Sequence, residues 1–119
     1  MREKSSTKVV IKTRGTYYLI PAEEILFCEE KAGRIRFHTR NHGLIPASGT
    51  INNYEPRLLP KGFFRTHEKY LVNLRHIIGF ENDPNSVFLM DFDHSIPIES
   101  RRELELLEKM NRMAKSKSC

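Results

Sequence analysis

Short runs of strand-forming residues, separated by turn residues, make up most of this sequence and constrain its fold more than any other feature. From Lys8 onward, KVVIKT and TYYLI flank Arg14 and Gly15, and EILFCEE and RIRFHT flank residues 31–33. Further runs of strand-forming residues are LIPASG, KYLVNL, HIIGFE, SVFLMDF and SIPIE. More turns are expected at 41–43, 83–85 and 93–94. Strands joined by such tight turns pair antiparallel. The sequence therefore predicts a mainly β fold.

One internal segment, TINNYEPRLLP, does not follow the strand pattern. Thr50 is a suitable N-cap residue, and Ile51, Tyr54 and Leu58 fall roughly on one face of a helix. Pro56 limits the length of that helix, because proline has no amide proton and crowds the preceding turn. We expect a short internal helix here.

The segment SRRELELLEKMNRMAK predicts a longer helix near the C-terminus. Ser100 and Glu103 have the spacing of a capping box, which marks a helix start. Apolar residues then recur at helical spacing, and basic residues gather toward the end, where the helix dipole favours them. The expected core-facing positions are Leu104, Leu107, Met110 and Ala114.

The chain has 119 residues, which suits one domain with a modest core. We expect a domain over residues 8–115, between a polar tail or linker remnant at 1–7 and a short tail at 116–119. No apolar run approaches the ~20 residues needed to span a bilayer, so no membrane contact is expected. Cys28 lies in an apolar run and is expected in the core, and a reducing cytoplasm fits this cysteine usage best.

The charged residues are segregated along the chain, which has a net charge of +5. Residues 31–40 contain four basic and no acidic side chains, whereas residues 81–99 contain five acidic side chains and no Lys or Arg. Surfaces without a special purpose usually mix their charges. The pattern favours one basic face and an anionic partner such as nucleic acid.

The stretch FFRTHEKYLVNLRHI alternates apolar and polar residues. Read as one unbroken strand, it places His67, Lys69, Asn73 and Arg75 on the same face. We expect Lys69 and Arg65 to face phosphate, because long basic side chains are seldom buried without partners. Asn73 has a second interpretation, in which its amide stabilises a neighbouring turn, and His67 has one as a buried, hydrogen-bonded histidine.

Two further pairs of arginines are candidates for binding an anion. Arg34 and Arg36 share one strand face beside a turn, where guanidinium groups can reach guanine or phosphate. Arg101 and Arg102 lie at the expected start of the C-terminal helix, where cations oppose the helix dipole. A bound anion would meet free backbone amides and two guanidinium groups there.

Metal and catalytic patterns are weak. His38 and His42 have a spacing seen in zinc sites, but no further Cys or His pair completes four ligands. The group of Asp91, Asp93 and His94 is better explained by a turn. No phosphate loop, HExxH motif or nucleophile elbow is present, so neither a cofactor nor a metal is expected. One catalytic alternative is a small metal-independent ribonuclease that uses His67 and Lys69 as acid and base. A basic RNA-binding or protein-binding module is another.

Three stretches together resemble the LytTR family of bacterial DNA-binding domains. FFRTHEKYLVNLRHI resembles the family pattern F-x-R-x-H-x-S-Y/F-x-V-N, and IPIESRRELELL resembles I-P-V-S-R-R followed by a helix. PAEEILFCEEKAGRIRFHT resembles the D-I-x-Y-x-E stretch and the strand after it. The resemblance covers residues 8–108. It implies an elongated fold of antiparallel strands whose loops enter successive major grooves of double-stranded DNA, often at direct-repeat promoter sites that can hold two protomers.

The resemblance also assigns contact residues and a regulatory context. Many members are output domains of two-component response regulators that control transcription. The first contact loop contains Arg34 with Arg36 beside it, the second contains His67, Glu68 and Lys69, and the third contains Ser100, Arg101 and Arg102. Arg34 and Arg102 are expected to contact bases, with Asn73, Arg65 and Arg75 in supporting positions and Asn73 bracing the second loop. Lys69 stands where the family usually has Ser, and Glu68 where a basic or amide residue is more common.

Overall fold

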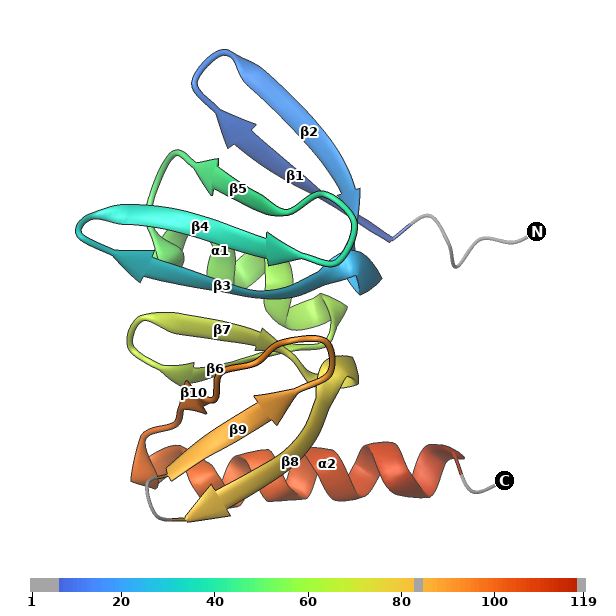
Figure 1. The fold of residues 1–119 in the computed structure, drawn as a ribbon. Coiled ribbons are helices and arrows are strands. Elements are labelled where there is room, and N and C mark those ends of the chain that lie inside the picture. Colours follow the sequence, from blue (N-terminus) through green and yellow to red (C-terminus); the bar gives the residue numbers. More distant parts are fainter. Residues whose placement is uncertain (1–6, 83–84, 118–119) are drawn as a thin grey trace.

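The computed structural model describes residues 7–82 and 85–117, which form a mainly β fold of antiparallel strands with two α-helices (Figure 1). This confirms the predicted fold class. The helices are α1 (Ile51–Leu58) and α2 (Glu103–Lys117), and four 3₁₀ turns occur at Ala22–Glu24, Leu59–Lys61, Leu74–His76 and Ser100–Arg102. The strands are β1 (Lys8–Thr13), β2 (Thr16–Pro21), β3 (Ile25–Lys31), β4 (Arg34–Thr39), β5 (Leu44–Ala47), β6 (Phe63–His67), β7 (Tyr70–Asn73), β8 (Ile77–Asn82), β9 (Asn85–Leu89) and β10 (Ile96–Pro97).

The strands form three sheets that lie one above the other in Figure 1. The central sheet has the order β5-β4-β3-β7-β6, with the β1–β2 hairpin on one side and the sheet β10-β9-β8 on the other. The extents of 41 × 40 × 25 Å describe a molecule that is thin along one axis. Within the described residues, neither helix has the length and apolar character needed to cross a bilayer.

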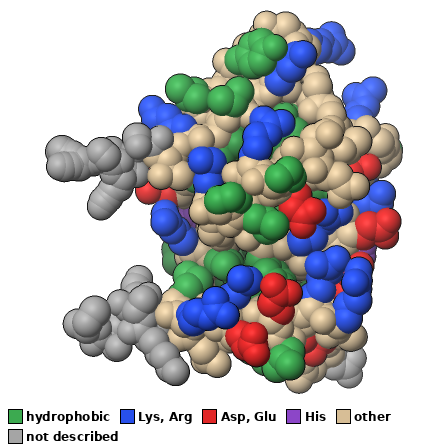
Figure 2. Space-filling model, turned by 180° about the vertical axis from the view of Figure 1, so that it is seen from behind, with side chains coloured by type: hydrophobic (Ala, Val, Ile, Leu, Met, Phe, Trp, Pro, Cys, Tyr) green, Lys and Arg blue, Asp and Glu red, His purple; other side chains and the backbone are tan. Residues whose placement is uncertain are grey.

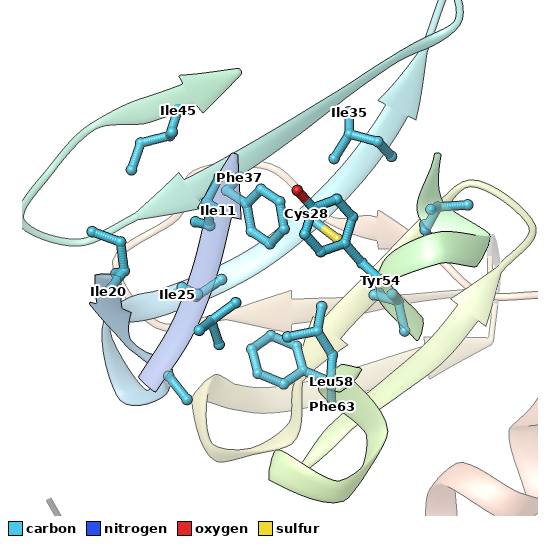
Figure 3. Close-up of a cluster of buried hydrophobic side chains, with 14 residues drawn as sticks. Ile11, Ile20, Ile25, Cys28, Ile35, Phe37, Ile45, Tyr54, Leu58 and Phe63 are labelled. Carbon is cyan, nitrogen blue, oxygen red and sulfur yellow. The ribbon is translucent and has the colours of Figure 1, made fainter. Parts of the chain in front are cut away.

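A first hydrophobic core lies between the central sheet, the β1–β2 hairpin and α1 (Figure 3). Alternation along β4 places Ile35 and Phe37 in this core, each with no exposed surface, and turns Arg34 and Arg36 to the other face. Tyr54 of α1 packs edge-on against Phe37. The predicted N-cap is confirmed, because the Thr50 side chain accepts a hydrogen bond from the amide of Asn53 within a capping box. Cys28 is fully buried in this core, as predicted.

A second core lies on the opposite face of the central sheet, under the three-stranded sheet and α2. Leu106 is fully buried and Met110 packs beside it, whereas Leu104 is 70% and Leu107 is 41% exposed. The predicted core-facing positions of this helix were therefore wrong, apart from Met110. The predicted positions and the observed pair, Leu106 and Met110, both have helical spacing. Which face of the helix is buried therefore depends on how the helix docks on the sheet.

The helix start was also predicted incorrectly. A 3₁₀ turn, Ser100–Arg102, precedes α2, and Glu99 is its N-cap residue, without a side-chain cap. The hydroxyl of Ser100 instead accepts a hydrogen bond of 2.8 Å from the Asn85 side chain. A contact with β9 therefore replaces the expected capping box.

The tight turns of the first two hairpins are confirmed. Ala32 and Gly33 have positive φ angles of 54° and 76°, as expected for a two-residue hairpin turn. Asp83 and Pro84 of another expected turn lie outside the described residues, and so do residues 1–6 and 118–119 of the expected tails. The β9–β10 connection spans residues 90–95 and is longer than the tight turn expected at 93–94.

Candidate nucleic-acid interface

Three segments that are far apart in the sequence meet along one edge of the molecule (left in Figure 1). They are the β3–β4 turn with the start of β4 (residues 31–34), the β6–β7 turn (67–69) and the turn that leads into α2 (99–102). We refer to these three segments as the contact edge. The stretch read as one unbroken strand is in fact broken at Glu68 and Lys69, which form the β6–β7 turn. That break places the second segment at this edge.

Backbone hydrogen bonds hold the three segments in register. The amide of Glu30, beside the first segment, donates to the carbonyl of Lys69 at 2.9 Å. The amide of Glu99 donates to the carbonyl of Thr66 at 2.8 Å. The Glu99 carboxylate accepts from the amide of Glu68 at 3.2 Å, which joins the second and third segments. Since these bonds involve the backbone, the relative placement of the segments does not depend on exposed side chains alone.

Glu99 is the electrostatic centre of the third segment. Its carboxylate accepts from Nε of Arg102 at 2.7 Å and lies 3.1 Å from Nη2 of Arg101. The hydrogen bond from Arg102, supported by the Glu68 amide and the charge of Arg101, lowers the pKa of the Glu99 carboxyl to about 2. Glu99 therefore stays ionised at neutral pH and restrains both arginines.

The two arginines of this segment differ in exposure. Arg102 is only 24% exposed, and its Nη1 also donates to the carbonyl of Arg65 at 3.3 Å. The Arg101 side chain is 73% exposed and contacts Glu99 alone among the described residues. Arg102 therefore links the 3₁₀ turn before α2 to β6, while the guanidinium of Arg101 is accessible to a ligand.

Arg65 lies inside the second segment, so the expectation that it faces phosphate is wrong. It is 9% exposed, and it donates to the carbonyl oxygens of His67 and Glu68. It also donates to Asn52 at 3.1 Å and Glu55 at 2.8 Å, both on α1. Arg65 thus fixes the shape of the β6–β7 turn from within, which agrees with a supporting role. Its partners on α1 come close only in the folded chain, which is why the sequence did not reveal them.

The side chains of the second segment are directed by local contacts. Nδ1 of His67 accepts a hydrogen bond of 3.0 Å from the amide of Lys69, so its neutral ring carries the proton on Nε2. This hydrogen bond engages the unprotonated nitrogen of His67 within its own turn. Lys69 is 47% exposed, with its ammonium 3.8 Å from the carboxylate of Glu30, and Glu68 is exposed in the turn.

The first segment presents Arg34 but not Arg36. Arg34 is exposed, and no ion pair to it is found in the part of the chain that the structure describes. Arg36 is half-buried, with Nη2 at 3.3 Å from the Glu29 carboxylate, and His38 contacts the same carboxylate at 2.8 Å. Burial, followed by the charge of Glu29, raises the pKa of Tyr70 beside this cluster. This cluster could not be predicted from the sequence, because its members come from three strands.

Asn73 and Arg75 lie at the far end of β7, opposite the contact edge. Asn73 is buried, donates to the carbonyls of Ala22 and Ile25, and accepts from the amide of Arg75. It therefore stabilises turns, as one interpretation of the sequence predicted, and does not brace the second contact segment. Arg75 is exposed in the 3₁₀ turn after β7 and does not border the edge.

Three of the five side chains considered as metal ligands form separate pairs with other residues. His38 contacts Glu29, His42 lies 3.1 Å from Glu24, and Asp91 forms an ion pair with Arg40 at 3.1 Å. Within residues 7–82 and 85–117, no group of three or more His, Cys, Asp or Glu side chains is arranged to hold a metal ion.

The surface of the contact edge is mixed in charge but rich in cations. Figure 2 shows Lys and Arg side chains along the margin opposite the two termini, with a few acidic side chains among them. The exposed cations of the edge come from three different segments: Lys31 and Arg34, Lys69, and Arg101. An arrangement of this kind can contact several phosphates of one extended polyanion.

The sequence model of the family described as the LytTr DNA-binding domain matches residues 15–111. Among solved structures, this chain is similar to a LytTr DNA-binding domain from Bacillus cereus, part of a protein described as a methyl-accepting/DNA response regulator. The two share 17% sequence identity with a TM-score of 0.71, over 87% of this chain and 96% of that chain, and at this identity the likeness shows the fold alone. The comparison with curated proteins found no match. Because the family match spans most of the 119 residues, the chain belongs to the LytTr DNA-binding domain family.

Proposed function

We propose that the contact edge binds double-stranded DNA sequence-specifically through the major groove, and that the chain regulates transcription at promoters without catalysing a reaction. The observation that carries this proposal is the convergence of three distant segments, each with an exposed cation, on one edge. Arg34, Lys69 and Arg101 are those cations. Each phosphate that the edge contacts would add about −0.9 to the slope of log affinity against log salt.

Base recognition is assigned to Arg34 and Arg101 in this proposal. Both guanidinium groups are exposed and can form paired hydrogen bonds with guanine, worth about 1–3 kcal/mol of discrimination each. Arg102, the choice from sequence alone, is held by Glu99 and by the carbonyl of Arg65 and is better suited to positioning. Ser100, His67 and Glu68 border these groups, and the Glu68 carboxylate can accept from the amino group of cytosine.

Single substitutions separate these roles. Arg101→Ala should weaken binding to a preferred duplex at least fivefold more than binding to random DNA. Arg102→Ala should weaken both to a similar extent and also lower the free energy of unfolding, because it removes the contact between the 3₁₀ turn before α2 and β6. If Arg102→Ala instead weakens binding to the preferred duplex selectively, and Arg101→Ala weakens binding to both duplexes equally, Arg102 is the residue that recognises bases.

The regulatory context is proposed on the family and on the response-regulator description of the Bacillus cereus protein. The domain would act as the output domain of such a regulator or as a stand-alone regulator, with two protomers on direct repeats. Selection of bound duplexes from a random pool at near-physiological salt tests the proposal. A motif repeated at intervals of about 10–10.5 base pairs, or a multiple, is expected. Equal retention of all duplexes, or stronger retention of RNA, would contradict it.

A further inference from the structure

A hollow of about 360 Å³ lies between the tip of the β1–β2 hairpin and the first segment of the contact edge. Thr13 and Arg14 of the hairpin line one side, and Gly33 and Arg34 of the β3–β4 turn line another. Residues 46–49, which follow from β5 toward α1, complete the wall. Sequence reasoning did not single out Arg14 except as a turn residue.

The hairpin tip is fixed against this wall. The Thr13 hydroxyl donates to the carbonyl of Pro46 at 2.6 Å, and the amide of Ser48 donates to the carbonyl of Lys12 at 2.8 Å. The amide of Arg14 donates to the Ser48 hydroxyl at 3.4 Å. Arg14 itself has a positive φ angle of 55°, which sets the direction in which its Cα–Cβ bond leaves the turn. The position of Arg14 relative to Arg34 is therefore set by the fold.

The charges around the hollow are uncompensated. Among the residues that the structure describes, none with an acidic side chain lines it. Arg14 and Arg34 are both exposed, and neither forms an ion pair with any residue of the described ranges. Elsewhere, Arg36, Arg65 and Arg102 each contact a carboxylate. Two guanidinium groups on facing loops repel each other weakly, and an anion between them would remove that repulsion.

We propose that Arg14 binds a backbone phosphate of the DNA duplex in this hollow, next to the base that Arg34 contacts. The proposal rests on the proposed function and adds a fourth anchor to the contact edge. A planar guanidinium matches the oxygens of a phosphate with two parallel hydrogen bonds. Each strand of a duplex has a phosphate about every 3.4 Å along the axis, so a backbone phosphate lies within reach of an anchor beside Arg34. Phosphate contacts fix register and orientation but carry no sequence information, so Arg14 would add affinity without adding discrimination between bases.

The test compares Arg14→Asn and Arg14→Lys with the unchanged chain in salt titrations of duplex binding. Asn removes the charge and tolerates the left-handed backbone of this position. Arg14→Asn should bind preferred and random duplexes about tenfold more weakly, with the same factor for both. Its slope of log affinity against log salt should be shallower by about 0.9, the value for one phosphate. Arg14→Lys should keep the slope of the unchanged chain.

Arg112→Gln is the matched control, because Arg112 is an exposed arginine toward the far end of α2. It should change the slope and the affinity little. If Arg14→Asn behaves like this control while Arg34→Ala weakens binding, the Arg14 anchor is overturned and the proposed function stands. If the unchanged chain binds no duplex, the proposed function fails and the anchor with it.

Discussion

Replacing Arg65 with alanine tests whether a buried guanidinium organises the second contact segment. The substitution removes contacts to two turn carbonyls, to Asn52 and to Glu55. Breaking a buried ion pair by removing one partner costs about 3–5 kcal/mol. Glu55 is 30% exposed, so water can reach the remaining carboxylate, and we expect a loss at the low end, about 3 kcal/mol. Domains of this size are stable by roughly 5–15 kcal/mol, so the variant should still fold.

Urea unfolding followed by circular dichroism measures this loss, and hydrogen exchange locates it. The Glu30 amide bonds to the carbonyl of Lys69 in the β6–β7 turn, so its protection should fall more than that of amides at the far end of β7. Arg65→Lys should be intermediate, because one ammonium cannot contact the turn carbonyls and α1 together. If Arg65→Ala lowers the free energy of unfolding by less than about 1 kcal/mol and the Glu30 amide stays protected, Arg65 does not organise the second contact segment.

Three further outcomes follow from the packing and the pKa shifts. Leu106→Ala should lower the free energy of unfolding, measured in urea, by about 2–5 kcal/mol, whereas Leu104→Ala should change it by less than about 0.5 kcal/mol. Equal losses for the two variants would contradict the assigned helix face. In a Cys119→Ser background, Cys28 should react with a thiol reagent only after unfolding, because burial raises the pKa of its thiol; rapid reaction of the folded chain would show that it is accessible. Glu99→Gln should be destabilising at neutral pH. Because the pKa of Glu99 is lowered from 4.5 to about 2, its contribution is complete above 4.5 and lost as the pH falls toward 2, so the two thermal unfolding curves should converge there.

The features that the sequence predicted well are those set by local interactions. The hairpin at Arg14 and Gly15, the turn before β4 and the N-cap at Thr50 each depend on residues within a few positions of one another. The shared strand face of Arg34 and Arg36 followed from simple alternation along β4. The motifs of the contact segments could likewise be read directly, since each is contiguous.

The features that were missed depend on tertiary contacts. Leu104 and Leu106 are each followed by an apolar residue three or four positions along the helix. Only docking on the sheet determines which of the two leucines is buried. The sequence alone indicates that Arg65 is a phosphate ligand, whereas in the fold it forms an ion pair with Glu55 of α1. The sequence alone indicates that Arg102 contacts bases, whereas in the fold it is restrained by hydrogen bonds to Glu99 and to a carbonyl of β6. Which basic residues are available to a ligand is therefore a property of the fold.

If the contact edge binds DNA as proposed, segments 31–34, 67–69 and 99–102 contact one duplex together. A titration of the ¹⁵N-labelled chain with a selected duplex, followed through the amide resonances, measures this directly. The largest changes are expected in these three segments and at Arg14, with little change in the turn after β7 or toward the end of α2. Changes centred on those distant elements, or on only one of the three segments, would contradict it.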